Sequence, residues 1–235
     1  DEEGDERPWF MVASFLDPHD IALWGYGTQR SEMFDFSVDD SVPEFGELFD
    51  TDMFAQTMNE DLSSKPASQR SYQETYKDWM QDVPPENYLR YYYSLHKRVD
   101  AQIAKVHEAI KASRFYDDTI IVFTSDHGDL LGSHGFMHQK WHQAYDEALR
   151  VPMLISTPDT RAAAQDGPVR EVASLTSHAD LVPTLLAMTG IDAAEQQEVL
   201  ATRFSDVAEP VGRDLSPVVA GETESLSDPI FFMTD

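Results

Sequence analysis

The sequence predicts an α/β fold in which helices cover a mostly parallel sheet. Residues 119–124 form a β-branched, apolar run that is typical of a strand buried inside a sheet. Residues 9–16 form a second run of this kind, and a long amphipathic pattern lies between the two. Strand, long helix, strand is the order of a crossover unit, which predicts parallel strands in a layered αβα architecture.

The first strand is expected over residues 9–16, followed at once by Asp17-Pro18-His19. Pro18 cannot donate a ladder hydrogen bond, so it ends the strand and holds His19 at the strand's carboxyl end. Residues 22–86 mix acids, aromatics and prolines without a sustained period. We interpret them as a long irregular excursion with short helical turns, for instance near 72–80. Loops of this length are usually functional, so the excursion is expected to cover the site or to form an oligomer contact, with equal weight.

A long helix is expected next, because Pro84-Pro85-Glu86-Asn87 is a typical helix start. Its apolar stripe recurs every three or four residues and consists of Leu89, Tyr92, His96, Val99, Ile103, Val106 and Ile110. Further strands are expected over 119–124, 151–156, 172–175 and 229–234, short helices over 145–149 and 181–188, an exposed connection over 161–167 and a short apolar turn over 215–220.

Charge and composition exclude several classes of protein. With 43 acidic and 17 basic residues, the net charge is -26, which argues against nucleic acid and anionic membrane as partners. The chain has no cysteine, so it has neither disulfides nor thiolate metal sites, and its redox compartment stays open. No apolar run is long enough to span a bilayer. At 235 residues the chain is expected to form one domain or most of one.

Four polar side chains suggest chemistry. Asp126 and His127 follow the strand over 119–124, at the end of a sheet where α/β proteins bind ligands. A carboxylate oxygen and an imidazole nitrogen both bind divalent cations. His19 ends the other predicted strand, and Lys140 supplies a compact positive charge. Together they predict a metal ion beside a cationic pocket that hydrolyses a small anionic ester of sulfate or phosphate.

At these residues the sequence resembles the sulfatase family of the alkaline-phosphatase-like superfamily. The resemblance rests on SFLDPHD, FTSDHGDLLGSHG, HQKWH, YDEALRVPMLIS and SHADLVPTLLAMTG, in that order. It implies an alkaline-phosphatase-like αβα fold, with Asp126 and His127 as ligands of a divalent metal ion, usually calcium and in some relatives manganese or magnesium. It also implies that Lys140 holds the anionic group and that His19 binds substrate and assists the leaving group.

His127, where many relatives have Asn, makes the chain similar to choline-sulfatase-like and phosphonate-monoester-hydrolase-like members. A nitrogen ligand also suits manganese better than calcium.

One departure concerns the nucleophile. The family uses a formylglycine made from Cys, or sometimes Ser, in a Cys-x-Pro-Ser-Arg type motif, and this chain has no Cys and no Ser-x-Pro-x-Arg. The family's remaining metal-ligand aspartates are missing too. Residues 1–235 are therefore expected to be the carboxyl-side part of one catalytic domain, with an incomplete sheet, a half-formed metal site and no turnover as a separate polypeptide.

Three alternatives remain open. The ester can be a phosphonate monoester or a phosphodiester instead of a sulfate. His127, His134, His138 and His142 can form a zinc cluster, since the last three are spaced by four residues as on one helix face. The chain can also be a non-catalytic fragment with a degenerate site. His178 and Asp180 are interpreted as groups that cap the start of a helix.

Overall fold

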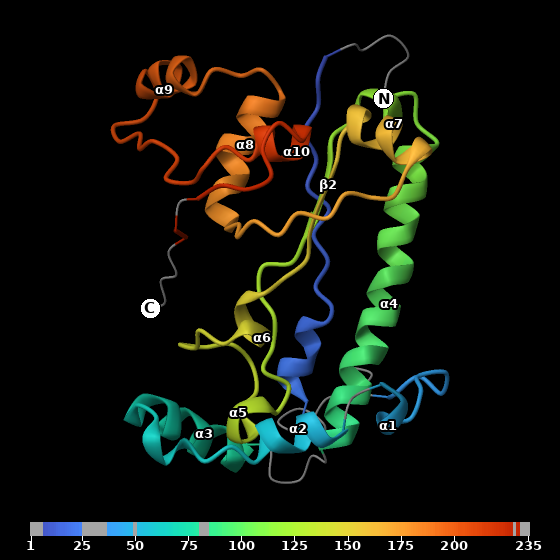
Figure 1. Ribbon diagram of the computed structural model, residues 1–235, viewed down its shortest axis with the longest axis vertical. Coiled ribbons are helices and arrows are strands. Elements are labelled where there is room, and N and C mark those ends of the chain that lie inside the picture. The colour runs from blue at the N-terminus through green and yellow to red at the C-terminus, as the bar shows by residue number, and fades with distance from the viewer. Residues whose placement is uncertain (1–6, 25–36, 49–50, 80–84, 228, 231–235) are drawn as a thin grey trace. The chain divides into compact units, whose positions relative to one another are not determined.

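The computed structural model describes residues 7–24, 37–48, 51–79, 85–227 and 229–230 (Figure 1). Its strands are β1 (Ile121–Thr124) and β2 (Met153–Ser156). Its α-helices are α1 (Phe45–Leu48), α2 (Thr51–Met58), α3 (Ala67–Trp79), α4 (Pro85–Lys111), α5 (Ser133–Phe136), α6 (Asp146–Leu149), α7 (Pro158–Asp166), α8 (Leu181–Met188), α9 (Ala193–Ala201) and α10 (Ser216–Ala220). Short 3-10 turns are η1 (His19–Leu23), η2 (Leu62–Ser64), η3 (Tyr116–Asp118) and η4 (His178–Asp180). Within the described ranges, no helix has the length and apolarity needed to cross a membrane.

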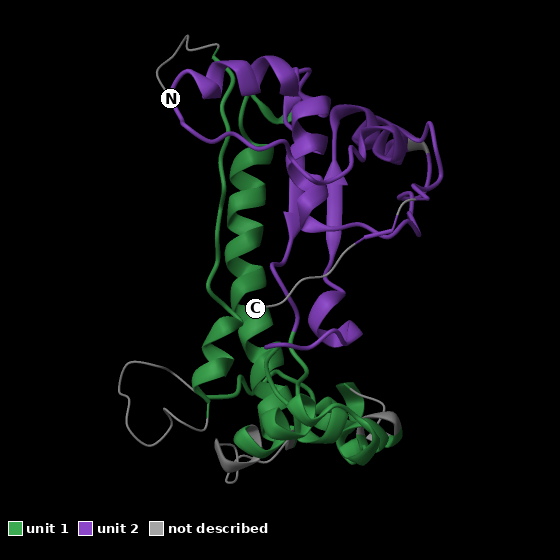
Figure 2. Ribbon diagram, turned by 90° about the vertical axis from the view of Figure 1, so that its left-hand side faces the viewer, with its two compact units in different colours: residues 1–116, 129–140 green, residues 117–128, 141–235 purple. Residues whose placement is uncertain are grey.

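The chain divides into two compact units, coloured separately in Figure 2. Unit 1 consists of Asp1–Tyr116 and Asp129–Lys140, and unit 2 of Asp117–Gly128 and Trp141–Asp235. The short segment Asp129–Lys140 thus packs with the amino-terminal half of the chain, although both of its sequence neighbours belong to unit 2.

The core of unit 1 forms on α4, where Tyr88, Tyr91 and Leu95 are almost fully buried with Ile21 of η1. These positions recur at three and four residues, as a helix face requires. Leu89 and Val99 of the predicted stripe are buried as well. The buried face therefore overlaps the predicted stripe and is broader than it at the start of α4, and His96 is the member of the stripe that does not follow the prediction. His96 is exposed, and its Nδ1 lies 3.0 Å from the carbonyl oxygen of Tyr92.

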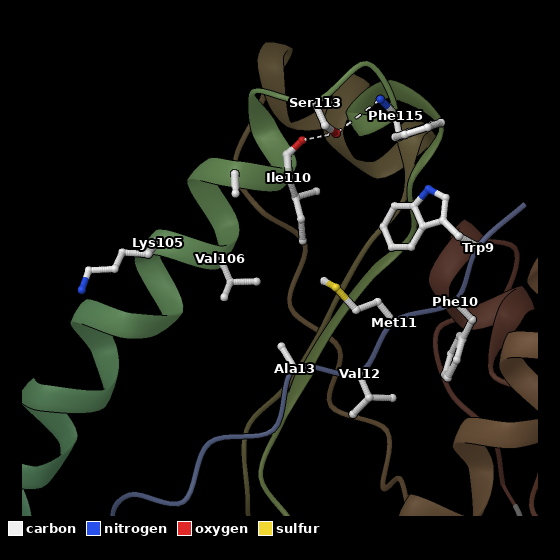
Figure 3. A pocket seen from close by; sticks show the side chains of 11 residues that line it. Trp9, Phe10, Met11, Val12, Ala13, Lys105, Val106, Ile110, Ser113 and Phe115 are labelled. Atoms are coloured by element: carbon white, nitrogen blue, oxygen red, sulfur yellow. Dashed lines mark hydrogen bonds between the residues drawn. The ribbon is translucent and has the colours of Figure 1, made fainter. Parts of the chain in front are cut away.

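Residues 9–16 are extended, but the prediction of a strand is wrong here, because they join no ladder in the described part of the chain. Their apolar side chains are consequently accessible, and Phe10 is 79% and Val12 72% exposed. A pocket of about 710 Å³ lies between this segment and α4, lined by Trp9 and Met11 on one side and Val106 and Ile110 on the other (Figure 3). Trp9 also packs edge-on against Phe115.

Unit 2 contains an antiparallel pair, in which Val122 of β1 lies opposite Ile155 of β2. Both strands occur where the sequence predicted them. The mostly parallel sheet is not found, because residues 9–16 contribute no strand and β1 pairs instead with the next strand along the chain. The described residues form this two-stranded sheet and no larger one.

Other predictions have mixed outcomes. The long helix and the short helices over 145–149 and 181–188 are confirmed, and α10 occupies the predicted turn at 215–220. The exposed connection expected at 161–167 instead lies largely within α7, which Thr157 caps by accepting a hydrogen bond from the Thr160 N–H, with Pro158 as its first residue. No strand forms at 172–175, and 231–234 lie outside the described residues. The excursion is more helical than expected, since it contains α1, α2 and α3, while 25–36, 49–50 and 80–84 lie outside the described residues.

Candidate functional site

Asp126 and His127 form the turn that follows β1 in unit 2. The His127 Nδ1 lies 2.7 Å from the Gly128 carbonyl oxygen, and a carbonyl only accepts, so Nδ1 carries a hydrogen. The other ring nitrogen, Nε2, lies 3.3 Å from Asp126 Oδ2. In neutral histidine both of these facing atoms present lone pairs. Either a second imidazole proton or a metal ion is therefore needed to make the approach favourable.

The spacing of these two atoms fits adjacent ligands of one cation. Ligands at right angles and about 2.2 Å from a metal ion lie about 3.1 Å apart, close to the observed 3.3 Å. The Asp126 side chain is 85% exposed, and its Oδ1 accepts the His127 backbone N–H at 3.1 Å, so Oδ2 is the oxygen that faces Nε2. In the described part of the chain, no three His, Asp or Glu side chains gather as a metal site. The pair therefore fits part of a coordination sphere.

Gly128 explains how this turn stays close to the rest of unit 2. Its N–H donates to the Ala148 carbonyl oxygen at 2.9 Å. A Cβ at this position would lie 1.9 Å from the Glu147 carbonyl oxygen, so the close backbone approach requires glycine.

His178 supports the same turn and was not predicted to do so. Its Nε2 lies 2.8 Å from the carbonyl oxygen of Ser125, the residue before Asp126. The predicted capping role is confirmed for Asp180, which accepts the Ser177 N–H at 2.9 Å. No local signal in the sequence indicates the His178 contact, because its partner lies 53 positions away in the chain.

Asp180 also forms an ion pair with Arg213. The Arg213 Nη2 lies 2.7 Å from Asp180 Oδ2, and the Arg213 backbone N–H donates to Oδ1 at 2.7 Å. Burial favours the neutral carboxyl, but these hydrogen bonds outweigh it and hold the pKa of Asp180 below its usual value. The ion pair thus ties the segment before α10 to the start of α8.

The loop Asp129–Lys140 belongs to unit 1 and carries the predicted anion-binding Lys140. Asp129 is only 8% exposed, and burial raises the pKa of its carboxyl to about 6. Hydrogen bonds from the Leu131 and Gln139 N–H groups and the positive charge of Lys140 act in the opposite direction. The role of Asp129 was missed because the sequence does not show from which backbone N–H groups its carboxylate accepts hydrogen bonds.

The proposed zinc face does not form. His134 and Gly135 have φ of 53° and 78°, so no regular helix passes through them. His138 is buried, with its ring 4.3 Å from that of Tyr88 and 5.0 Å from that of Phe136. Burial among these rings lowers the pKa of His138 to about 3. This environment suits a neutral core histidine.

The four predicted site residues are divided between the units. Asp126 and His127, in unit 2, lie together. His19, which begins η1 and is exposed, and Lys140, which is half-buried, belong to unit 1. The convergence of all four on one cavity therefore stays a prediction.

Comparison with known proteins establishes the class. The family model Sulfatase matches residues 2–191, and this chain belongs to that family. Among curated relatives, an uncharacterized sulfatase of Escherichia coli is 30% identical over 196 residues, covering 81% of this chain and 33% of its own. Choline-sulfatase of Rhizobium meliloti is 29% identical over 195 residues, with 80% and 33% covered.

Two solved structures are also similar. A 2-O GAG sulfatase has a TM-score of 0.61 at 24% identity, with 91% of this chain and 42% of that chain covered, which shows the fold. A phosphonate monoester hydrolase of Silicibacter pomeroyi has a TM-score of 0.50 at 28% identity, covering 70% and 29%. The chain spans about a third of the length of the curated relatives it matches. Its fold is therefore similar to that of sulfatases of known structure, which are alkaline-phosphatase-like, and its relatives include sulfatases and a phosphonate monoester hydrolase.

Proposed function

We propose that this chain supplies part of the metal site and the anion site of an enzyme that hydrolyses sulfate monoesters. The observation that carries the proposal is the facing of Asp126 Oδ2 and His127 Nε2 at 3.3 Å, with Nδ1 already bonded to a carbonyl. Family membership supports the ester chemistry.

Each residue has a distinct role. Asp126 and His127 would hold a divalent ion, calcium or, because of the nitrogen ligand, manganese, with magnesium as the third choice. Such an ion withdraws charge from the nonbridging oxygens of the ester. Lys140 binds the same anionic group as a point charge, and His19 donates a proton to the leaving oxygen. The substrate is a small anionic ester, and the net charge of -26 disfavours nucleic acid and anionic membrane.

The metal assignment is tested by titrating the purified chain with Mn²⁺ and Ca²⁺, using calorimetry and, for manganese, electron paramagnetic resonance. Asp126→Ala and His127→Ala are each expected to weaken binding about tenfold or more, because each removes one of two ligands. Asp118→Ala is the matched control, since it removes an exposed carboxylate just before β1. Equal affinities in all four proteins would overturn the assignment.

Activity supplies the second test. In the full-length polypeptide that contains this sequence, Asp126→Ala is expected to abolish sulfate-ester hydrolysis, and Lys140→Ala to slow it about a hundredfold or more. The 235-residue chain alone has no cysteine and is expected to show no turnover. Turnover by the isolated chain, purified free of other sulfatases, would contradict the proposed dependence on a formylglycine.

Phosphonate monoesters are a second candidate, favoured by the similarity to the Silicibacter pomeroyi hydrolase. Sulfate and phosphonate monoesters each have a tetrahedral centre and a single negative charge, so Lys140 and a metal ion suit both. Comparing kcat/KM for 4-nitrophenyl sulfate and for 4-nitrophenyl phenylphosphonate distinguishes them. Absence of metal and sulfate binding at saturating concentration would favour a non-catalytic fragment instead.

A further inference from the structure

The base of the loop that leads to Lys140 is closed by one buried carboxylate. Asp129 Oδ1 accepts the backbone N–H of Leu131 at 2.8 Å and that of Gln139 at 3.1 Å. The two ends of the loop also form a direct hydrogen bond, which the Leu130 N–H donates to the Gln139 carbonyl oxygen at 2.9 Å. A single side chain therefore joins the beginning of the loop to the residue that precedes Lys140.

The two residues bonded by Asp129 have unfavourable backbone conformations. Leu131 has φ of 51° and Gln139 has φ of 66°, in the left-handed region that non-glycine residues rarely adopt. Such conformations persist when surrounding contacts hold them. The N–H bonds to Asp129 provide that support at both positions, so loss of the acceptor is expected to release the backbone on either side of the loop.

Side chains from residues 60–73 hold the loop at three further points. The Tyr72 hydroxyl of α3 donates to the His138 carbonyl oxygen at 2.6 Å, and Gln73 Nε2 donates to that of Gly135 at 2.5 Å. His134 Nδ1 lies 2.8 Å from Glu60 Oε2. His134 and Gly135 lie at the tip of the loop, whereas the Tyr72 bond holds the His138 carbonyl, which belongs to the same peptide group as the Gln139 N–H. Asp129 and Tyr72 therefore restrain one peptide group directly before Lys140, Asp129 through its N–H and Tyr72 through its carbonyl oxygen.

We propose that Asp129 is a positioning residue, which acts on the reaction by fixing the backbone that presents Lys140 to the anionic group. The inference rests on the proposed function of Lys140. Asp129 itself contacts neither substrate nor metal in this scheme. Its two hydrogen bonds need an acceptor oxygen and not a negative charge. A substitution that keeps the oxygen and removes the charge should therefore preserve the role.

The test is a double-mutant cycle on sulfate-ester hydrolysis by the full-length polypeptide, with kcat and KM measured for each variant. Asp129→Ala is expected to lower kcat/KM about tenfold to a hundredfold, as misplacement of a catalytic group does. Asp129→Asn keeps the acceptor oxygen and is expected to recover most of that loss. In Lys140→Ala, adding Asp129→Ala is expected to change kcat/KM less than about twofold, because the residue that Asp129 positions is already absent.

The outcomes separate this inference from the proposed function. If Lys140→Ala leaves hydrolysis unchanged, the function assigned to Lys140 fails. Suppose that Lys140→Ala lowers kcat/KM as expected. The positioning role alone is then overturned if Asp129→Ala leaves kcat/KM unchanged, or if Asp129→Ala lowers kcat/KM as much in the Lys140→Ala background as in wild type. If Asp129→Ala does not fold, Asp129→Ser replaces it in the cycle, because serine is small and polar but its hydroxyl is too short to accept both N–H groups. Asp129→Ser is expected to lower kcat/KM severalfold in the presence of Lys140 and not in its absence, and equal effects on both backgrounds would overturn the inference.

Discussion

The imidazole Nε2 of His178 lies 2.8 Å from the carbonyl oxygen of Ser125, and it joins the start of the α8 region to the end of β1. These residues are 53 positions apart in the sequence. The bond holds the backbone one residue before the proposed metal ligand Asp126. A contact of this kind can influence metal binding without a ligand role for His178.

The first prediction concerns the loss of this hydrogen bond. His178→Ala is expected to lower the free energy of unfolding by about 1 kcal/mol, the usual contribution of one hydrogen bond, and to weaken Mn²⁺ binding severalfold. His178→Gln can place an amide donor where Nε2 lies and is expected to restore both quantities. Urea unfolding and manganese titration measure them, and unchanged values in His178→Ala would refute the prediction.

The second prediction concerns the close approach at Gly128. Gly128→Ala places a methyl group 1.9 Å from the Glu147 carbonyl oxygen, so the backbone must move. We expect a loss of about 2–4 kcal/mol in the free energy of unfolding, measured with urea. Gly167→Ala is the matched control, because its Cβ meets no atom within 4 Å. Similar stabilities for the two variants would show that the turn after β1 tolerates a side chain.

The third prediction concerns Arg213. Arg213→Ala leaves the buried Asp180 carboxylate without its guanidinium and is expected to cost about 3–5 kcal/mol. Since the pKa of Asp180 is lowered in the folded protein, its stabilising contribution is present above the unfolded pKa of 3.8 and is lost as pH falls. Arg203→Ala, at an exposed site, is the control. Chemical unfolding at pH 7 and below pH 4 should therefore show a smaller difference between Arg213→Ala and wild type at the lower pH.

The fourth prediction isolates His138. Its pKa of about 3 in the folded protein lies below the ordinary 6.5, so unfolding takes up a proton between these values. The stability that results is present above pH 6.5 and is lost as pH falls toward 3, by up to about 5 kcal/mol for such a shift. His138→Gln cannot gain this charge and is expected to lose less stability from pH 7 to pH 4 than wild type does.

Asp129 must be considered in the same measurement. Its raised pKa, about 6, has the opposite effect, because the folded state gains a proton more readily and stability falls as pH rises through 6. The pH dependence of wild type is therefore a sum of opposing contributions, and the informative quantity is the difference between His138→Gln and wild type. Parallel pH profiles for the two proteins would contradict the burial of a neutral His138.

Local sequence patterns predicted the elements that depend on local interactions. Helical periodicity located α4, and the β-branched run located β1, because both signals act over a few residues. The Asp-His-Gly turn was also predictable, since a glycine after a strand marks a sharp change of direction. The helix α7 was missed although its Thr157 cap and Pro158 are local signals.

Pairing and hydrogen-bond partners required the tertiary structure. Residues 9–16 have the composition of a strand, yet a strand exists only where another backbone offers a ladder, and none does so in the described chain. For the same reason, the sequence could not show that His178 bonds Ser125 or that Asp129 bonds Gln139. The sequence by itself determined the family, the two candidate ligands and the lysine, because these depend on residue type and order. The tertiary structure decided which backbone groups support them, because a hydrogen bond depends on distances between residues that are far apart in the chain.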